Sequence, residues 1–343
     1  MENNFNRIII SRTDSIGDVV LTLPMCGIIK EQFPGCQIIF LGTNYTRSVV
    51  DCSVHVDEFL AWDELKTQSR KEQLKILRSD VILHVFPDKE IASLAKKARI
   101  HLRVGTSHRV FHWTSCNKLL NFSRKNSDLH ESQLNLKLLG PLGLKREFSI
   151  SELAGYYGLG KMQPLNEKYR ALIDKNRFNL ILHPKSKGSA REWGLENFGG
   201  LVKELAREKF RIFITGTKED GAMMKSFLHD YSGVVDLTGR LSLAELISFI
   251  NEVDGLVSAS TGPLHIAAAL GKIACGIYAP LRPVDPGRWG PVGKNARVFV
   301  LNKECNNCRK SGDCLCIRSV SPGQVSGFLK KLSNNPGLKP GNS

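Results

Sequence analysis

Residues 254–291 read DGLVSASTGPLHIAAALGKIACGIYAPLRPVDPGRWGP, and this stretch decides the fold that we expect for the chain. Residues 256–259 are apolar enough for a short buried strand, and residues 273–279 for a second one. Between them, residues 264–270 suit a helix, which Gly271 ends. A strand, a helix and a second strand in this order predict a βαβ unit of a parallel sheet.

The residues before this helix favour an anion at its N-terminus. Ser260 and Thr261 offer a cap, Gly262 allows close approach, and Pro263 suits the first turn. Unpaired N–H groups and the positive end of the helix dipole would face the anion, most simply a phosphate. His265 lies in the first turn and could add a donor. The alternative is a buried histidine in an ordinary βαβ unit.

The loop that follows the second strand contains Arg282, Asp285, Arg288 and Trp289 among prolines and glycines. In open parallel sheets, ligands bind beyond the carboxyl ends of the strands. The run STGPLHIAAALG, followed by YAP and DPGRWGP, resembles the nucleotide-sugar-binding half of glycosyltransferase family 9, the lipopolysaccharide heptosyltransferases. The resemblance implies that this half of the chain binds the donor.

Composition limits the class of protein. The 343 residues suit two domains, and 42% hydrophobic with 24% charged residues is ordinary for a globular protein. No apolar run is long enough to span a membrane, and the start MENNFNRIII is too short for a secretory signal, so we expect a cytoplasmic protein. The net charge of +15 favours an acidic partner. Helix-turn-helix, zinc-finger and RNP patterns are missing, so we expect no nucleic acid but a phosphorylated glycolipid at the anionic inner membrane surface.

The N-terminal region predicts a first strand–loop–helix unit. Residues 7–11 suit a strand and residues 18–33 a helix, which Pro24 should kink or shift. The loop RTDSIGD between them places Asp14 and Asp18 on the ligand side of the sheet, where either could also simply cap the helix. The run SIGDVVLTLP resembles the family sequence that contains the general base, and the match falls on Asp18.

A basic run follows in the same half. No acidic residue lies between Glu90 and Asp128, which favours an anion-facing surface over an ordinary solvated one. We expect this half to bind the acidic acceptor, with Arg103 and Arg109 as acceptor-binding residues. The basic residues of the run are Lys96, Lys97, Arg99, Arg103, Arg109, Lys118, Arg124 and Lys125.

A second loop rich in small and basic residues begins the other half. Residues 179–182 suit a strand, and HPKSKGSAREW follows them. Small residues let the backbone approach a diphosphate that cationic side chains neutralise. The loop resembles the second donor-binding loop of the family, which implies that Ser186, Lys187, Ser189 and Arg191 bind the donor.

Three positions depart from the family pattern. Lys185 stands where glycine is common, and Gly194 where proline is common. Ser260 stands where many members have an aspartate near the transferred sugar. The departure at Ser260 leaves the identity of the donor sugar open rather than the fold.

Four of the nine cysteines form the pattern C-x2-C-x5-C-x-C near the C-terminus. Two pairs within twelve residues could hold zinc or iron, and a related group that glycosylates surface proteins uses such a cluster for iron. The C-x-C arm is weaker evidence than two C-x2-C arms, so we favour structural thiols and no metal. The four residues are Cys305, Cys308, Cys314 and Cys316.

Together, the resemblance implies a GT-B fold, with two facing Rossmann-like domains and an active-site cleft between them. We expect an acceptor-binding domain at residues 1–165, a nucleotide-sugar-binding domain at 175–332 and a disordered tail at 333–343. The expected activity is inverting transfer of heptose from ADP-heptose to the lipopolysaccharide inner core by a monomer that needs no cofactor. Two alternatives are a protein-modifying heptosyltransferase with a cysteine-bound metal, and a glycolipid- or nucleotide-sugar-binding protein without activity.

Overall fold

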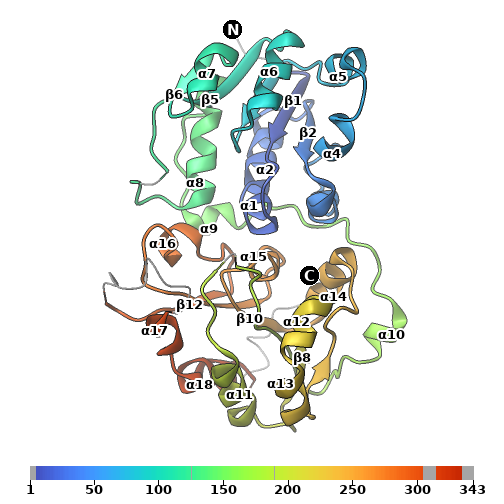
Figure 1. Cartoon of the computed structure of the whole chain (residues 1–343), viewed down its shortest axis with the longest axis vertical. Coiled ribbons are helices and arrows are strands. Elements are labelled where there is room, and N and C mark those ends of the chain that lie inside the picture. The colour runs from blue at the N-terminus through green and yellow to red at the C-terminus, as the bar shows by residue number, and fades with distance from the viewer. Residues whose placement is uncertain (1–4, 125, 189, 304–313, 334–343) are drawn as a thin grey trace. The chain divides into compact units, whose positions relative to one another are not determined.

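Two parallel six-stranded sheets organise the part of the chain that the computed structural model describes, residues 5–124, 126–188, 190–303 and 314–333. The chain divides into two units, Met1–Lys161 and Met162–Ser343, which we call unit 1 and unit 2 (Figure 1). Each unit contains one sheet with its own helices. The prediction of an α/β fold with two parallel sheets is therefore confirmed. The predicted tail at 333–343 lies outside the described residues, except for Ser333.

The sheet of unit 1 has the strand order β3-β2-β1-β4-β5-β6, which is the order of dinucleotide-binding folds. Strands β1 to β3 are added toward one edge of the sheet and strands β4 to β6 toward the other, so the strand order reverses between β1 and β4. In such sheets, ligands bind beyond the strand ends at this point. The strands are β1 (Arg7–Ser11), β2 (Gln37–Gly42), β3 (Glu58–Ala61), β4 (Val81–His84), β5 (Leu102–Thr106) and β6 (Lys118–Leu120).

The helices of unit 1 follow from local sequence. In α6, for example, Asp88 accepts hydrogen bonds from the amides of Glu90 and Ile91, and every third or fourth residue is buried. The helices are α1 (Ile16–Val20), α2 (Leu23–Gln32), η1 (Asn44–Thr46), α3 (Arg47–Asp51), α4 (Trp62–Leu65), α5 (Arg70–Ile76), α6 (Lys89–Lys97), α7 (Val110–Ser115), α8 (Glu131–Leu136), η2 (Lys137–Leu142) and α9 (Ile150–Leu153).

The helix predicted at residues 18–33 is two helices. α1 begins at Ile16, two residues earlier than predicted, and the chain breaks between Val20 and Leu23. Pro24 explains the break, because proline lacks an N–H and is tolerated only in a first helical turn, where it stands in α2.

The sheet of unit 2 has the order β12-β11-β10-β7-β8-β9, the same arrangement read from the other edge. Here the reversal lies between β7 and β10, and these two strands are followed by the two loops predicted to bind the donor. The strands are β7 (Phe178–His183), β8 (Phe210–Ile214), β9 (Val235–Asp236), β10 (Gly255–Ala259), β11 (Ile273–Ile277) and β12 (Ala296–Phe299).

The helix of the opening stretch, α15, begins at Gly262, two residues before the predicted start, and Thr261 rather than Ser260 is its N-cap residue. It ends before Gly271, whose φ of +70° is the left-handed conformation expected there. The helices of unit 2 are α10 (Glu167–Arg170), α11 (Leu195–Glu204), α12 (Lys218–Met223), α13 (Lys225–Asp230), α14 (Leu243–Glu252), α15 (Gly262–Ala269), α16 (Pro286–Trp289), α17 (Leu315–Arg318) and α18 (Pro322–Ser333).

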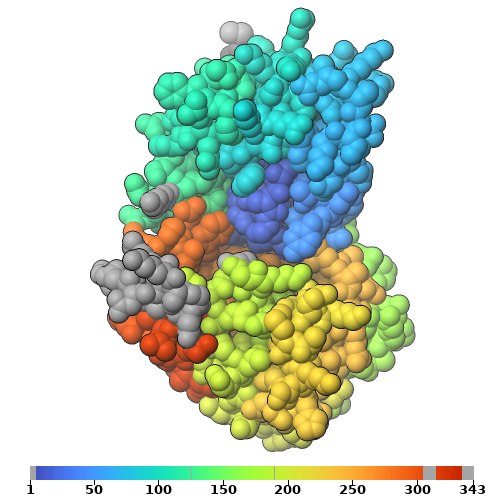
Figure 2. Space-filling model, viewed as in Figure 1, coloured from blue at the N-terminus to red at the C-terminus, as the bar shows by residue number. Residues whose placement is uncertain are grey.

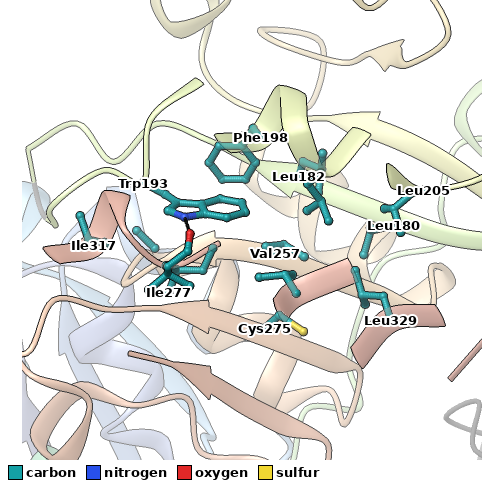
Figure 3. Packing of buried hydrophobic residues seen from close by; sticks show 14 of the residues in the cluster. Leu180, Leu182, Trp193, Phe198, Leu205, Val257, Cys275, Ile277, Ile317 and Leu329 are labelled. Carbon is teal, nitrogen blue, oxygen red and sulfur yellow. Dashed lines mark hydrogen bonds between the residues drawn. The ribbon is translucent and has the colours of Figure 1, made fainter. Parts of the chain in front are cut away.

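Trp193 fixes the loop between β7 and α11 to the core of unit 2. Its indole is fully buried against Phe198 of α11, with ring centroids 4.9 Å apart (Figure 3). The indole Nε1 donates a hydrogen bond of 2.8 Å to the carbonyl of Val320. The loop between β7 and α11 is thus anchored at its C-terminal end by a large buried side chain. Among the described residues, no helix is long and apolar enough to cross a membrane.

Candidate functional site

Asp18 lies in the first turn of α1, the helix that follows β1, and β1 is one of the two strands between which the strand order of unit 1 reverses. Its carboxylate is about one-fifth exposed, at 18%. Arg12 donates to Oδ1 and the hydroxyl of Ser15 donates to Oδ2. Because both oxygens have a donor, the carboxylate is fixed in orientation while one side remains open to solvent. The side chain that caps a helix end would bond to backbone amides instead, and Asp18 does not take that role in this structure.

Arg12 is the centre of a buried ion network that holds this loop. Its guanidinium binds both oxygens of Asp14 at 2.8 and 3.0 Å, and its Nη1 donates to Glu131 at 3.2 Å and to Asn135 at 3.1 Å. Burial alone would lower the pKa of Arg12, but the charges of Asp14, Asp18 and Glu131 outweigh it and raise that pKa above its ordinary value.

Asp14 has an unusual electrostatic setting. Burial raises the pKa of its carboxyl to about 6, the charge of Arg12 opposes this rise, and the nearby charge of Asp18 adds to it. The Arg12 guanidinium is shared by three carboxylates, those of Asp14, Asp18 and Glu131. With a pKa of about 6, the carboxyl of Asp14 takes up a proton as the pH falls through 6.

Helix α8 completes the network from far along the chain. Glu131 is bound by Arg124 as well as by Arg12, and Arg124 also donates to Asn135 at 2.9 Å. The amide of Asn135 in turn donates to Thr22 at the break between α1 and α2. Sequence reasoning missed this network. The one available signal was Arg12 itself, a charged residue directly after an apolar strand that needs acidic partners once buried.

The two predicted acceptor-binding arginines have different settings. Arg103 is half-buried, and its guanidinium donates to the backbone carbonyls of Ser115, at 2.8 Å, and of Ile100. These donors are therefore used within unit 1. Arg109 is exposed at the N-cap position of α7. Lys125, another member of the basic run, lies outside the described residues.

In unit 2, hydrogen bonds join the loops after β7, β8 and β10. The hydroxyl of Ser258 donates to the carbonyl of His183 at 2.8 Å and lies 2.9 Å from the hydroxyl of Thr261. The Nδ1 of His183 is 2.9 Å from the hydroxyl of Thr215. Burial lowers the pKa of His183 to about 4, so this imidazole is neutral at physiological pH. These contacts fix the N-terminal end of α15 to the strand ends around it.

The predicted anion site at α15 begins with Thr261, whose backbone is extended and whose side chain makes no capping bond to the helix. Gly262 and Pro263 form the first turn, which leaves the first amides of the helix without a side-chain cap. His265 follows one turn in and is buried, with 3% of its surface exposed. Ser260 precedes the helix and forms a side-chain hydrogen bond with Tyr278.

The loop after β7 has a constrained backbone. Lys187 and Gly188 both adopt positive φ angles, +50° and +79°, and the side chain of Lys187 is exposed. A non-glycine residue in this region is uncommon and is often found at ligand sites. Ser186 donates to the carbonyl of Ala190 at 2.9 Å, which closes the loop. Arg191 follows and is half-buried, whereas Ser189 lies outside the described residues.

The structure explains the lysine that departs from the family pattern. Lys185 forms an ion pair with Glu192, and the same carboxylate accepts a 3.1 Å hydrogen bond from the amide of Ser186. Lys185 therefore spans the base of the loop. Gly194 has a φ of +96°, a conformation that proline cannot adopt, so the second departure changes the local backbone.

The loop with Arg282, Asp285, Arg288 and Trp289 includes the short helix α16. Asp285 caps this helix by accepting a 2.9 Å hydrogen bond from the amide of Gly287. The phenol of Tyr278 donates to the carbonyl of Trp289 at 2.6 Å, so the loop is tied back to the end of β11.

Two of the four cysteines of the C-terminal pattern lie within the residues that the structure describes. Cys314 and Cys316 are buried in the hydrophobic core of unit 2, beside residues such as Ile317 and Val320. Cys305 and Cys308 lie outside the described residues. Within residues 5–303 and 314–333, apart from the two undescribed positions, no three His, Cys, Asp or Glu side chains are grouped so that they could hold a metal ion.

Comparisons with known proteins agree with this geometry. The lipopolysaccharide core heptosyltransferase OpsX of Haemophilus influenzae is 21% identical over 314 residues, which cover 86% of this chain and 85% of that protein. The structure is similar to that of E. coli ADP-heptose lps heptosyltransferase II, with a TM-score of 0.72, 18% identity, and coverage of 97% of this chain and 99% of that one. It is also similar to E. coli heptosyltransferase WaaC with ADP, with a TM-score of 0.67, 17% identity, and coverage of 95% and 99%.

These structures have the GT-B fold, and the likeness confirms the predicted fold class for this chain. The sequence pattern that defines glycosyltransferase family 9 (heptosyltransferase) matches residues 92–316. That match covers the basic run of unit 1, the loop after β7 and the whole of α15 with its flanking strands. The chain therefore belongs to glycosyltransferase family 9, the heptosyltransferase family.

Proposed function

We propose that this enzyme transfers heptose from ADP-heptose to a hydroxyl of the lipopolysaccharide inner core, with inversion at the anomeric carbon. The family and the lipopolysaccharide heptosyltransferases among its relatives support the acceptor class. The similar E. coli structures, one named for ADP-heptose and one containing ADP, support the donor. The observation that favours a catalytic role most is the carboxylate of Asp18, held by two donors at the reversal point of the sheet.

In the proposed reaction, Asp18 accepts the proton of the acceptor hydroxyl while that oxygen attacks the anomeric carbon. The bond from this carbon to the donor phosphate oxygen breaks in the same displacement, and ADP leaves with the electron pair. A single displacement inverts the configuration and needs no covalent intermediate. Because Arg12 and Ser15 already orient both carboxylate oxygens, the base is positioned before the acceptor arrives.

Groups of unit 2 would stabilise the diphosphate as it gains charge. The uncapped amides at the start of α15 and its helix dipole provide one set of donors. Lys187 and Arg191 in the loop after β7 provide cationic side chains close to the same sheet reversal. Fixed donors of this kind take the role that a divalent metal has in many nucleotide-sugar enzymes, so we propose metal-independent catalysis.

The acceptor would bind to unit 1. Exposed basic groups around α7, Arg109 in particular, suit the phosphates of a lipopolysaccharide core. Arg103 contributes by holding the backbone of this region through the carbonyls of Ile100 and Ser115. Its role in acceptor binding is thus indirect.

Asp18→Asn tests the mechanism. The amide keeps the size of the side chain but does not accept the proton, so turnover should fall by about 10²–10⁴ while ADP affinity stays within about twofold. Ser15→Ala is a matched control, because it removes one orienting donor but leaves the base, and it should cost about tenfold or less. Turnover of Asp18→Asn close to that of the unmodified enzyme would remove Asp18 from the mechanism.

A further inference from the structure

Unit 1 exposes an unusual group of apolar side chains on α7 and β6. Val110 is 85% exposed and Trp113 66%, and they stand three residues apart on one side of the helix. Leu119 of β6 is 37% exposed. Large apolar side chains in such exposed positions often mark an interaction surface when they are grouped.

The backbone geometry relates Leu119 to α7 through Gly105 of β5. A Cβ added to Gly105 of β5 would lie 2.6 Å from Nδ1 of His112 and 2.9 Å from Sγ of Cys116, so α7 covers the face to which Gly105 points. Leu119 is paired with Gly105 in the parallel register, and residues paired in this way point to the same face. Leu119 therefore points to the sheet face that α7 covers, one strand further toward the edge of the sheet. We call Val110, Trp113 and Leu119 the α7 surface.

This surface is rigidly attached to unit 1. The indole Nε1 of Trp113 donates to the carbonyl of Ser107 at 2.7 Å, so its polar atom is satisfied and its rings remain exposed. The ammonium of Lys96 donates to the carbonyl of Thr114 at 2.7 Å and ties α6 to α7. A tryptophan fixed in this way exposes apolar area without needing to change conformation.

The part of the chain that contains the α7 surface is strongly basic. Residues 91–127 contain eight lysines and arginines and no acidic residue, a formal charge of +8. The segment from α6 to β6, coloured teal to green, forms part of the surface of unit 1 (Figure 2). Apolar side chains surrounded by basic groups are typical of proteins that bind the interface of an anionic bilayer. Apart from Arg109, which the proposed function assigns to the acceptor, the exposed basic residues are Lys96, Lys97, Arg99 and Lys118.

We propose that the α7 surface docks the enzyme on an anionic phospholipid bilayer. Val110 and Trp113 enter the headgroup region, and the surrounding basic groups bind lipid phosphates. Nucleic acid would satisfy the basic groups and could stack on Trp113, but it offers nothing for Val110, the most exposed of the three side chains. The inference rests on the proposed function, in which the acceptor is a glycolipid that is itself embedded in such a bilayer.

Vesicle flotation tests the docking. The full-length protein should bind vesicles of phosphatidylcholine with a quarter phosphatidylglycerol, bind pure phosphatidylcholine much less, and dissociate as salt rises. Trp113→Ala/Val110→Ser should weaken binding to the anionic vesicles by about tenfold. Val110→Ser alone changes an 85% exposed residue and leaves the hydrogen bond of Trp113 in place. This single variant should weaken binding to the anionic vesicles by about threefold. Tyr45→Ala is the matched control, because this aromatic residue is 60% exposed near the other edge of the same sheet. The Tyr45→Ala variant should bind the anionic vesicles as the unmodified protein does.

The same variants are assayed for transfer to a detergent-free, deacylated acceptor, whose turnover should be unchanged. Several results would overturn the docking proposal: no vesicle binding by the unmodified protein, equal binding by the double variant, or binding of single-stranded DNA but not of vesicles. A loss of turnover on the deacylated acceptor would assign the surface to substrate binding instead. If no variant transferred sugar while vesicle binding followed the predicted order, only the proposed function would fail.

Discussion

Replacement of Arg12 by methionine should destabilise the protein strongly, because it removes the shared cation of the buried network. Glu131 keeps Arg124 as a partner, so the uncompensated groups are Asp14 and Asp18. Breaking a buried ion pair costs about 3–5 kcal/mol. The side chains of Asp14 and Asp18 are 21% and 18% exposed, and water offsets part of the loss. We expect the free energy of unfolding at pH 7 to fall by about 2–4 kcal/mol.

Urea unfolding followed by circular dichroism measures this loss. Arg146→Met is the control, because Arg146 forms an ion pair with Glu152 in which the side chains are 62% and 41% exposed. Exposed pairs contribute under about 1 kcal/mol, so this variant should unfold almost as the unmodified protein does. Arg12→Lys should lie between the two, since a lysine keeps the charge but not the forked geometry that reaches several carboxylates. Equal stability of Arg12→Met and Arg146→Met would refute the network as a stabilising element.

Three further predictions concern pH, acceptor and donor. Because burial raises the pKa of Asp14 to about 6 in the folded state, the contribution of Asp14 to stability is fully present below about pH 4 and is lost as pH rises through 6. The free energy of unfolding of Asp14→Asn should therefore gain up to about 3 kcal/mol relative to that of the unmodified protein between pH 4 and pH 7. Urea unfolding at both pH values measures this gain, and a constant difference between the two proteins would contradict the prediction. Arg109→Gln should raise the KM for the phosphorylated acceptor several-fold and leave ADP affinity unchanged in calorimetry, whereas an equal loss of ADP affinity would place it in the donor site. Arg191→Ala should weaken ADP-heptose binding and slow transfer, by about 2–4 kcal/mol in total, and full ADP affinity would exclude it from the diphosphate site.

The sequence predicted the strands that are buried on both faces and the loops that follow them. β1, β7, β10 and β11 are short apolar runs next to glycine or polar turns, which is how a central parallel strand appears in sequence. The strands that were missed are shorter or more polar. β5 contains Arg103, and β6 begins with an exposed lysine at the sheet edge, so the basic run concealed both strands.

The side-chain network around Asp18 could not be predicted in the same way. Arg12 and Glu131 are 119 positions apart, and only the folded sheet brings α8 to the end of β1. The sequence therefore indicated Asp18 as the candidate base, but not that Arg12 and Ser15 orient its carboxylate or that Asp14 binds the same guanidinium. Likewise, the exposure of Val110 and Trp113 depends on which face of α7 covers Gly105, and this is a property of packing.

The most direct test of the central claim is product analysis with the purified protein, ADP-heptose and a lipopolysaccharide inner-core acceptor. Mass spectrometry of the acceptor and chromatography of the nucleotide should show one heptose added for each ADP released, and NMR should show the anomeric configuration opposite to that of the donor. Asp18→Asn should give almost none of either product. Release of ADP without a heptosylated acceptor, or a product that keeps the donor configuration, would contradict the account.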